Sequence, residues 1–287
     1  MTPPILSHAG QLLARYDVIF CDVWGVVHDG AQAYPLACEA LTRFAAGGGS
    51  VVLVSNAPVP KERVAAMLEA RAVPQSAWHA IVSSGDIALE HVAKAHYRAL
   101  HCIGPKDRDQ ALFAKLTARQ VALADAEAIL CSGLTDDINE TAQTYRPMLE
   151  LALARELPFV CANPDLVVHV GGKHFVCAGA IADLYQHMGG PVFWAGKPHP
   201  SAYGTALEVA QQLRGAAIAP GQILAIGDAL RTDLKAAHCA GVDALFIAGG
   251  IHRHDTMNGG IIEPAKLAAL FAGSGVPALG AMAYLRW

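Results

Sequence analysis

Short apolar runs alternate along the chain with segments of helical periodicity. The runs Val18–Cys21 and Val51–Val54 each end at polar residues, Asp22 in the first case and Ser55 in the second. Four apolar residues bounded by turn-forming residues indicate a buried strand. Because a helical segment follows each run, the pattern predicts a doubly wound, mostly parallel sheet covered by helices, an α/β fold.

Two helices are expected after the first two strands. Pro35 can begin the first, and the glycines at positions 47–49 end it. Its apolar positions on one face are Leu36, Ala40, Leu41 and Phe44. Pro60 can begin the second helix, whose apolar side carries Val64, Met67 and Leu68.

The C-terminal part repeats this alternation. The segments "PVFWAGKPHP" (191–200), "QILAIGDALRTD" (222–233) and "VDALFIAGG" (242–250) each hold a short apolar run that ends in glycine or polar residues. They are expected to add strands to the first sheet.

The middle of the chain has strands of its own. Candidates lie in "LHCIG" (100–104), "AILCSG" (128–133) and "FVCAN" (159–163), with a polar helix beginning near Asp137 and a hairpin in "VVHVGGKHFV" (167–176). This pattern predicts a second α/β domain inserted into the first. The expected boundaries are residues 1–78 with 190–287 for the core and 79–189 for the insertion.

Composition excludes several classes of protein. The 287 residues are 53% hydrophobic and 16% charged, with a formal charge of −4 and no Lys/Arg-rich run, so neither nucleic acid nor a membrane is an expected partner. No apolar stretch approaches the ~20 residues that span a bilayer, and no secretory leader is recognisable. Seven cysteines without a Cys-x-x-Cys pair favour free thiols in a reducing compartment. We therefore expect a soluble, cytoplasmic protein.

Polar groups that could carry chemistry stand at the predicted strand ends. They are Asp22, Ser55, Lys197, and Asp228 with Asp233. Ligands of parallel sheets bind at the carboxyl ends of the strands, so these groups could meet at one edge. Singly, Asp22, Ser55 and Lys197 are equally explained as turn residues. The two carboxylates of "GDALRTD" suit a hard divalent cation better than a turn.

The order of these groups resembles the haloacid dehalogenase superfamily of aspartate-nucleophile hydrolases. The position of the insertion, "ANPD" at 162–165 and "GKP" at 196–198 resemble its class IIA, the phosphatases of the NagD and p-nitrophenyl phosphatase type. The resemblance implies a Rossmann-like core with an inserted class II α/β cap, and a Mg²⁺-dependent phosphatase acting on a small phosphorylated metabolite. It also implies a homodimer formed through the cap.

The resemblance implies a role for each matching residue. Asp22 would attack phosphorus and form an aspartyl phosphate. Asp22, the Trp24 carbonyl and Asp228 would bind Mg²⁺, with Asp233 holding the site from behind or through water. The phosphoryl oxygens would be bound by Ser55, Asn56 and Lys197. The two residues of "ANPD" assigned to the substrate or cap are Asn163 and Asp165.

Trp24 departs from the superfamily pattern. The usual DxDG motif has a second aspartate here, a general acid and base, whereas "DVWGV" is similar to a minor branch of class IIA. An indole N–H does not exchange protons at a useful pKa. Trp24 could fill space beside the nucleophile or stack on a ring of the substrate.

Three interpretations follow from the missing aspartate. The protein hydrolyses substrates with good leaving groups, or His28, Asp29 or His199 replaces the acid, or the site binds a phosphorylated ligand without turnover. The last would make it a regulatory or binding protein. The substrate itself is not specified by these residues.

Overall fold

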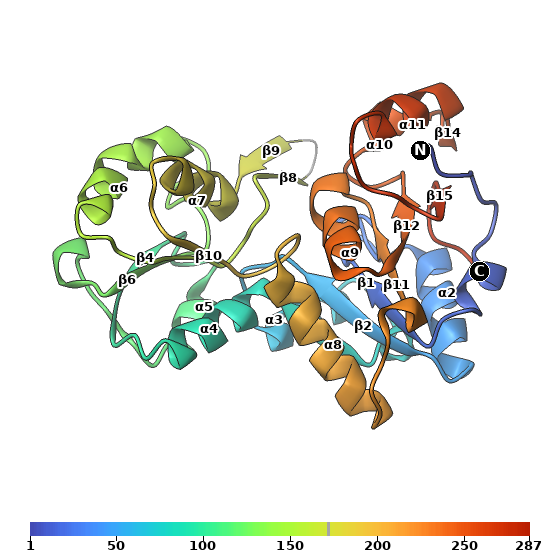
Figure 1. Cartoon of the computed structure of the whole chain (residues 1–287), viewed down its shortest axis with the longest axis horizontal. Coiled ribbons are helices and arrows are strands. Elements are labelled where there is room, and N and C mark those ends of the chain that lie inside the picture. The colour runs from blue at the N-terminus through green and yellow to red at the C-terminus, as the bar shows by residue number, and fades with distance from the viewer. Residues whose placement is uncertain (171–172) are drawn as a thin grey trace. The chain divides into compact units, whose positions relative to one another are not determined.

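The computed structural model describes residues 1–170 and 173–287. The chain forms two compact units. The first comprises Met1–Ser55, Ala65–Val82 and Ala202–Trp287, and the second comprises Asn56–Val64 and Ser83–Ser201. Each contains a sheet with helices (Figure 1). The predicted α/β class is therefore confirmed.

The first unit is built on a six-stranded sheet of order β15-β12-β11-β1-β2-β3. The strands are β1 (Val18–Cys21), β2 (Ser50–Ser55), β3 (Ala80–Ser83), β11 (Ile223–Gly227), β12 (Asp243–Ile247) and β15 (Gly280–Met282). Neighbours from β15 to β2 pair in parallel. The chain runs outward from β1 to β3 on one side and from β11 to β15 on the other. The order therefore reverses between β1 and β11, which is where such sheets bind ligands.

Apolar strands and amphipathic helices explain this arrangement. Every residue of β1 and β11 is buried, as expected for central strands covered on both faces. The helix α2 (Pro35–Ala46) has proline in its first turn and ends at Gly47, as predicted. Leu36, expected on its buried face, is 52% exposed. The buried face is rotated towards Ala37 and Cys38 instead.

The other elements of the first unit are helices and a small ribbon. Its helices, including two that cross the boundary between the units, are α1 (Gly10–Leu13), α3 (Lys61–Glu69), η1 (Gln75–Ala77), α8 (Pro200–Arg214), η4 (Pro220–Gln222), η5 (Leu230–Leu234), α9 (Lys235–Ala240), α10 (Arg253–Thr256) and α11 (Pro264–Phe271). A small antiparallel ribbon is formed by β13 (Met257–Asn258) and β14 (Ile261–Ile262).

The second unit has a five-stranded sheet of order β10-β7-β6-β4-β5, in which all neighbours are parallel. The strands are β4 (Ala99–Ile103), β5 (Arg119–Gln120), β6 (Ala128–Cys131), β7 (Phe159–Cys161) and β10 (Val192–Trp194). The helices are α4 (Ser84–Lys94), α5 (Gln110–Phe113), η2 (Leu123–Asp125), η3 (Ala142–Tyr145), α6 (Arg146–Leu153) and α7 (Ala178–His187). The predicted hairpin is present as β8 (Val167–Val170) and β9 (Lys173–Val176), although residues 171–172 lie outside the described part.

Two further sequence expectations are wrong. The strand of 191–200 does not join the first sheet, because β10 pairs with β7 in the second unit. The polar helix does not begin near Asp137, because Asp136 Oδ1 accepts the N–H groups of Ile138 and Asn139 and closes a turn there. The expected boundaries at 79 and 189 stay a prediction. In the structure, β3 extends the first sheet to Ser83.

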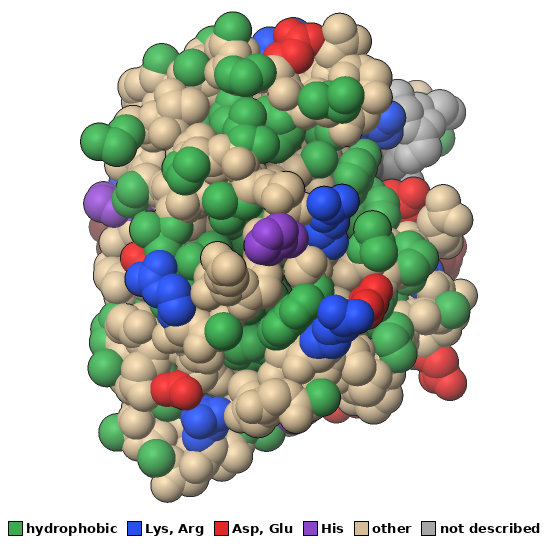
Figure 2. Space-filling model, turned by 90° about the vertical axis from the view of Figure 1, so that its right-hand side faces the viewer, with side chains coloured by type: hydrophobic (Ala, Val, Ile, Leu, Met, Phe, Trp, Pro, Cys, Tyr) green, Lys and Arg blue, Asp and Glu red, His purple; other side chains and the backbone are tan. Residues whose placement is uncertain are grey.

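The surface shows scattered charge. On the face drawn in Figure 2, Lys and Arg side chains lie apart from one another, separated largely by hydrophobic and uncharged surface. Within residues 1–170 and 173–287, no helix is long and apolar enough to cross a membrane. All seven cysteines are free thiols, and five of them are buried.

Candidate active site

Two aspartates stand at the carboxyl ends of adjacent parallel strands. Asp22 directly follows β1 and Asp228 directly follows β11. The register pairs Cys21 with Ile226, and the Asp22 N–H donates to the Ile226 carbonyl at 2.8 Å. With Asp233, these residues each offer a carboxylate oxygen, and the three oxygens lie within 4.8 Å of one another. The order of strands thus unites carboxylates that are about two hundred residues apart in sequence.

Glycine backbone surrounds the Asp228 carboxylate. Asp228 is 5% exposed, and its Oδ2 accepts the Ile251 N–H at 2.6 Å. A Cβ at Gly25 would lie 2.0 Å from this oxygen, and a Cβ at Gly250 would lie 1.9 Å from it. Neither position can carry a side chain without displacing the carboxylate. Gly25, at φ +83°, additionally adopts a conformation that glycine accepts without strain.

A π-helix positions the third carboxylate. Asp233 lies in the single π-helical turn η5, and its Oδ2 accepts the Ala229 N–H at 3.1 Å. The Cβ of Asp233 lies where Gly227 leaves room, because a Cβ at Gly227 would be 2.1 Å from it. Single π-helical turns often occur at functional sites, where they redirect a side chain. Here the turn holds Asp233, which is buried, beside the other two aspartates.

The chemistry of this donor set fits a hard divalent cation. The three side chains offer only carboxylate oxygens, the ligands that Mg²⁺ prefers. Three ionised carboxylates this close repel one another, and a bound divalent cation would offset the repulsion. The predicted metal residues Asp22, Asp228 and Asp233 are thus together. The Trp24 carbonyl as a further ligand stays a prediction.

Ser55 occupies the same edge of the first sheet. It ends β2, whose Leu53 pairs with Cys21 of β1. Ser55 therefore lies two residues beyond that pair, next to the strand that ends before Asp22. The strand register therefore places Ser55 at the edge where the carboxylates meet, and the contact of its hydroxyl with a phosphoryl group stays a prediction.

A polar cluster in the second unit involves Asn56 and Lys197, both buried. Asn56 Oδ1 accepts the Lys197 N–H at 2.8 Å, and its Nδ2 donates to the Lys197 carbonyl at 3.0 Å. The same Nδ2 donates to Asp165 Oδ1 at 2.9 Å. The amide of Asn56 therefore fixes the backbone of the predicted lysine. Asn56 directly follows Ser55 along the chain.

The two residues of "ANPD" have structural partners. Asn163 Oδ1 accepts the Asp165 N–H at 3.1 Å, which closes the turn after β7. Asp165 in turn receives the Asn56 amide. Their predicted contact with substrate stays a prediction.

Trp24 packs against the loop that follows Asp22. A Cβ at Gly30 would lie 2.4 Å from its Cζ2 atom, so the ring rests on bare backbone. The His28 ring meets it edge to face, with centroids 5.2 Å apart. Trp24 is nevertheless 36% exposed. It is held in place without being enclosed, so both the packing and the stacking interpretations stay open.

Two of the three candidate replacement acids are poorly suited to that role. His28 is 1% exposed, and its Nδ1 accepts the Gly30 N–H at 2.9 Å. Burial, helped by the charge of Arg71, lowers the pKa of His28 to about 4. Asp29 Oδ1 accepts the N–H groups of Gln32 and Ala31, and these bonds hold the pKa of its carboxyl below the ordinary range. At neutral pH the Asp29 carboxyl is therefore ionised, and His28 is a neutral imidazole and not the acidic imidazolium.

His199, the third candidate, lies in the second unit. Its ring stacks on Trp194, with centroids 4.8 Å apart and planes at 4°. Its backbone N–H donates to the Gly196 carbonyl. A catalytic role for His199 stays a prediction.

Sequence reasoning missed the residues that hold the carboxylates. They are Gly25, Gly227, Gly250 and the backbone N–H of Ile251. Gly227 is the last residue of β11 and Gly250 follows the end of β12 by three residues, so both are visible in the sequence as glycines at strand ends. Their close approach to Asp228 and Asp233 depends on how neighbouring strands are paired, which no local pattern reveals.

Comparison with protein families agrees with this geometry. A family model described as haloacid dehalogenase-like hydrolase matches residues 19–121, and a second, described as HAD-hydrolase-like, matches residues 194–272. The two matches bracket most of the second unit and contain Asp22 and Asp228.

Individual relatives extend the similarity to the whole chain. A hydrolase of the haloacid dehalogenase-like family from Brucella suis 1330 is 37% identical, covers 99% of each chain and superposes with a TM-score of 0.83. The ribonucleotide monophosphatase NagD of Escherichia coli K12 is 24% identical over 86% of this chain and 93% of its own length. A structure described as a possible sugar phosphatase from Cytophaga hutchinsonii ATCC 33406 shares the fold, at 17% identity over 98% of each chain and a TM-score of 0.77.

Proposed function

This chain belongs to the haloacid dehalogenase-like hydrolases, and from that premise we propose that it is a Mg²⁺-dependent phosphatase of small phosphorylated metabolites. The observation that carries the proposal is the meeting of Asp22, Asp228 and Asp233 at one edge of the first sheet. The names of the relatives, a ribonucleotide monophosphatase and a possible sugar phosphatase, support a phosphate ester as the substrate.

Asp22 is the nucleophile in this proposal. One of its carboxylate oxygens attacks phosphorus, the bond from phosphorus to the leaving oxygen breaks, and an aspartyl phosphate remains. Water then attacks that phosphorus, which releases inorganic phosphate and regenerates the carboxylate. Hydrolysis is thereby divided into two displacements at phosphorus. The Asp22 carboxylate is the nucleophile in the first and the leaving group in the second.

Three other groups oppose the charge of the phosphoryl group. Ser55 donates its hydroxyl and Lys197 places an ammonium on the phosphoryl oxygens, with the Asn56 N–H as a further donor. Support for Lys197 comes from its burial and from the two hydrogen bonds that fix its backbone to Asn56. Mg²⁺ held by Asp22, Asp228 and the Trp24 carbonyl, with Asp233 behind them, would neutralise charge that repels the nucleophile.

The proton for the leaving oxygen is the missing component. Trp24 cannot supply it, Asp29 is ionised at neutral pH, and His28 is then a neutral imidazole, which is a very weak acid. General acid catalysis typically contributes ~10²–10⁴-fold. We therefore propose a phosphatase for esters with good leaving groups, such as aryl and acyl phosphates.

A phospho-ligand binding protein is the second candidate, and Trp24 is the observation that favours it. A binder would still need the groups that hold phosphate, but it has no need of a nucleophile. Retention of Asp22 beside the acidic pair therefore favours the enzyme.

Trapping the covalent intermediate separates the two candidates. Wild-type protein incubated with Mg²⁺ and phenyl phosphate and quenched in acid should carry phosphate on the peptide that contains Asp22, as seen by mass spectrometry. The Asp22→Asn variant should carry none, while the exposed-loop control Asp29→Asn should resemble wild type. A wild type that binds inorganic phosphate but never becomes phosphorylated would support the binding protein instead.

A further inference from the structure

The segment after β12 is fixed at the edge of the sheet that carries the acidic residues. Thr256 is completely buried, and its Oγ1 donates to the carbonyls of Ala248 and His252 at 3.0 and 2.7 Å. The Arg253 N–H donates to the carbonyl of Gly250 at 3.0 Å. These bonds hold α10 against the end of β12. Gly250 is also the residue whose backbone touches Asp228.

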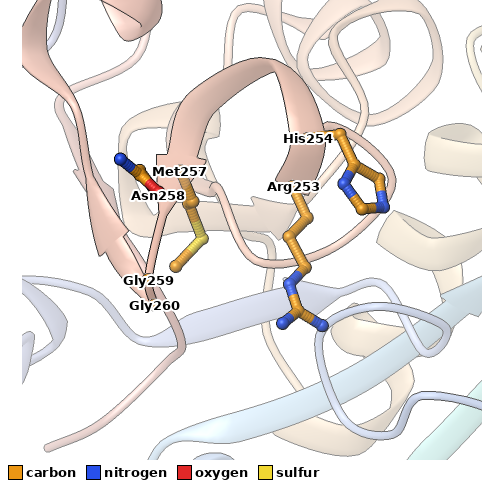
Figure 3. A pocket seen from close by; sticks show the side chains of 6 residues that line it. All are labelled: Arg253, His254, Met257, Asn258, Gly259 and Gly260. Atoms are coloured by element: carbon orange, nitrogen blue, oxygen red, sulfur yellow. The ribbon is translucent and has the colours of Figure 1, made fainter.

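A pocket of about 300 Å³ opens beside α10. It is lined by Arg253, His254, Met257, Asn258, Gly259 and Gly260. Figure 3 shows the Arg253 side chain extending away from Met257 and Asn258, with His254 beside it. The volume is at the lower end of the range of pockets that bind small molecules. Among these six lining residues, the side chain of Arg253 carries a positive charge.

Arg253 is an uncompensated cation. Its side chain is exposed, and within the described residues its guanidinium has neither an ion-pair nor a hydrogen-bond partner, whereas the neighbouring His252 Nδ1 lies 3.3 Å from Asp255 Oδ2. A guanidinium offers five donors in a plane that matches carboxylates and phosphates. The N–H donors of the Arg253 guanidinium are therefore available to bind an anion.

The charge of Arg253 reaches the surroundings of the acidic site. Burial is the main cause that raises the pKa of Tyr34 to about 12. Asp29, Tyr284 and Asp228 raise it further, and Arg253 opposes that rise. The backbone places Arg253 beside the acidic site, because its N–H donates to the carbonyl of Gly250, whose own backbone lies against the Asp228 carboxylate.

We propose that Arg253 binds a second anionic group, a carboxylate or a further phosphate, on the substrate whose phosphoryl group reaches Asp22. This inference rests on the proposed function, because it deepens the substrate class of the same site. A substrate with two anionic ends would be repelled by three carboxylates. Arg253 supplies the counter-charge for the end that remains outside the metal site, and the pocket receives the body of the molecule.

Binding of phosphonates tests this directly, without turnover. We compare phosphonoacetate, 3-phosphonopropionate and 4-phosphonobutyrate with alkylphosphonates of matched length, by calorimetric titration in the presence of Mg²⁺. For at least one chain length, the wild-type protein should bind the carboxylated phosphonate about 10- to 100-fold more tightly than the alkylphosphonate of the same length. This is the size of effect that hydrogen bonds to a charged group produce. Arg253→Gln should lose that preference. The control Arg43→Gln, whose side chain forms an ion pair with Glu39 on α2, should keep it.

Equal binding of the matched pairs by wild type, binding of neither, or a preference that survives in Arg253→Gln would overturn the assignment. Hydrolysis separates it from the proposed function. Arg253→Gln should lower kcat/KM for 4-carboxyphenyl phosphate more than for phenyl phosphate. A wild-type protein that cleaves neither ester would contradict the proposed phosphatase activity. The titrations with phosphonates would still test the role of Arg253, because they do not depend on turnover. An equal loss for both esters leaves the phosphatase standing and overturns the second-anion site.

Discussion

The Trp24 ring changes what one loop can contribute to catalysis. Where the family pattern has a carboxyl group, this chain has an indole that rests on Gly30 and meets His28. His28 is consequently enclosed, and its pKa falls to about 4 because burial disfavours the imidazolium. The loop thus loses one proton donor by substitution and a second by burial.

Replacing Gly250 is predicted to weaken metal binding as much as replacing a metal ligand does. In Gly250→Ala the added Cβ would lie 1.9 Å from Asp228 Oδ2, so the carboxylate must move. We expect Mg²⁺ affinity, measured calorimetrically, to fall about as much as in Asp228→Asn, because both changes remove a charged oxygen from the site. The control Gly204→Ala has nothing within 4 Å and should bind Mg²⁺ like wild type. Unchanged affinity in a folded Gly250→Ala protein would contradict this geometry.

Burial of His28 predicts a pH dependence of stability. Its pKa is about 4 in the folded protein and 6.5 in an ordinary environment, so between these values the unfolded chain binds more protons. The free energy of unfolding should therefore fall as the pH drops from about 6.5 to about 4, by up to about 3 kcal/mol, and this contribution is complete above that window. His28→Asn keeps an acceptor for the Gly30 N–H but does not titrate.

Urea unfolding of both proteins at pH 7, 5.5 and 4.5 measures the difference. The His28→Asn profile should be flatter than the wild-type profile across this range. Identical profiles would mean that His28 titrates normally in the folded protein.

At the scale of elements, one side chain connects segments that are distant in sequence. Asn56, at the start of the segment after β2, binds both backbone groups of Lys197, after β10, and the Asp165 carboxylate, after β7. An asparagine amide has one acceptor and two donors, so it can satisfy a peptide group on both sides. The three segments are therefore held in one fixed arrangement within the second unit.

Removal of this amide should weaken the fold. In Asn56→Ala the buried N–H and carbonyl of Lys197 lose their partners, which costs about 1–3 kcal/mol of unfolding free energy. The exposed-helix control Gln212→Ala should differ from wild type by less than about 0.5 kcal/mol. Chemical denaturation measures both. An Asn56→Ala protein as stable as wild type would show that water or a neighbouring group replaces the amide.

The parts of the site that could be predicted from sequence are those fixed by chain order. Asp22, Ser55 and Asp228 each follow an apolar run, and parallel strands bring such ends to one edge. The hydrogen bonds of Asn56 with Lys197 join residues 141 positions apart, and nothing local specifies them. The strand β10 was placed in the wrong sheet because a run of three apolar residues fits either sheet equally well. Only pairing with β7 decides the matter.

At the scale of the whole molecule, the second unit is the proposed cap. We expect the second unit, which contains most of the predicted cap at residues 79–189, to rotate as one body when a phosphate mimic binds, because domain closure typically occurs at a few hinge residues. Crystal structures without ligand and with Mg²⁺ and orthovanadate, superposed on the first sheet, would measure this rotation. Rearrangement within the segment, or an unchanged position with orthovanadate bound, would contradict a cap. Gel filtration of the full chain would test the homodimer predicted to form through it.

The dependence of rate on the leaving group tests the central claim most directly. We would measure kcat/KM of the wild-type protein with Mg²⁺ for substituted phenyl phosphates and for ethyl phosphate, and plot its logarithm against the pKa of the leaving alcohol. Without a general acid, the enzyme cannot compensate for a poor leaving group. The rate acceleration of ~10²–10⁴-fold that an acid contributes is then lost, and the loss is greatest for substrates whose leaving alcohol has a high pKa. A steep fall in rate with rising pKa, with ethyl phosphate almost inert, is the predicted result. A flat line that includes ethyl phosphate would show that another residue donates the proton, and it would contradict the account.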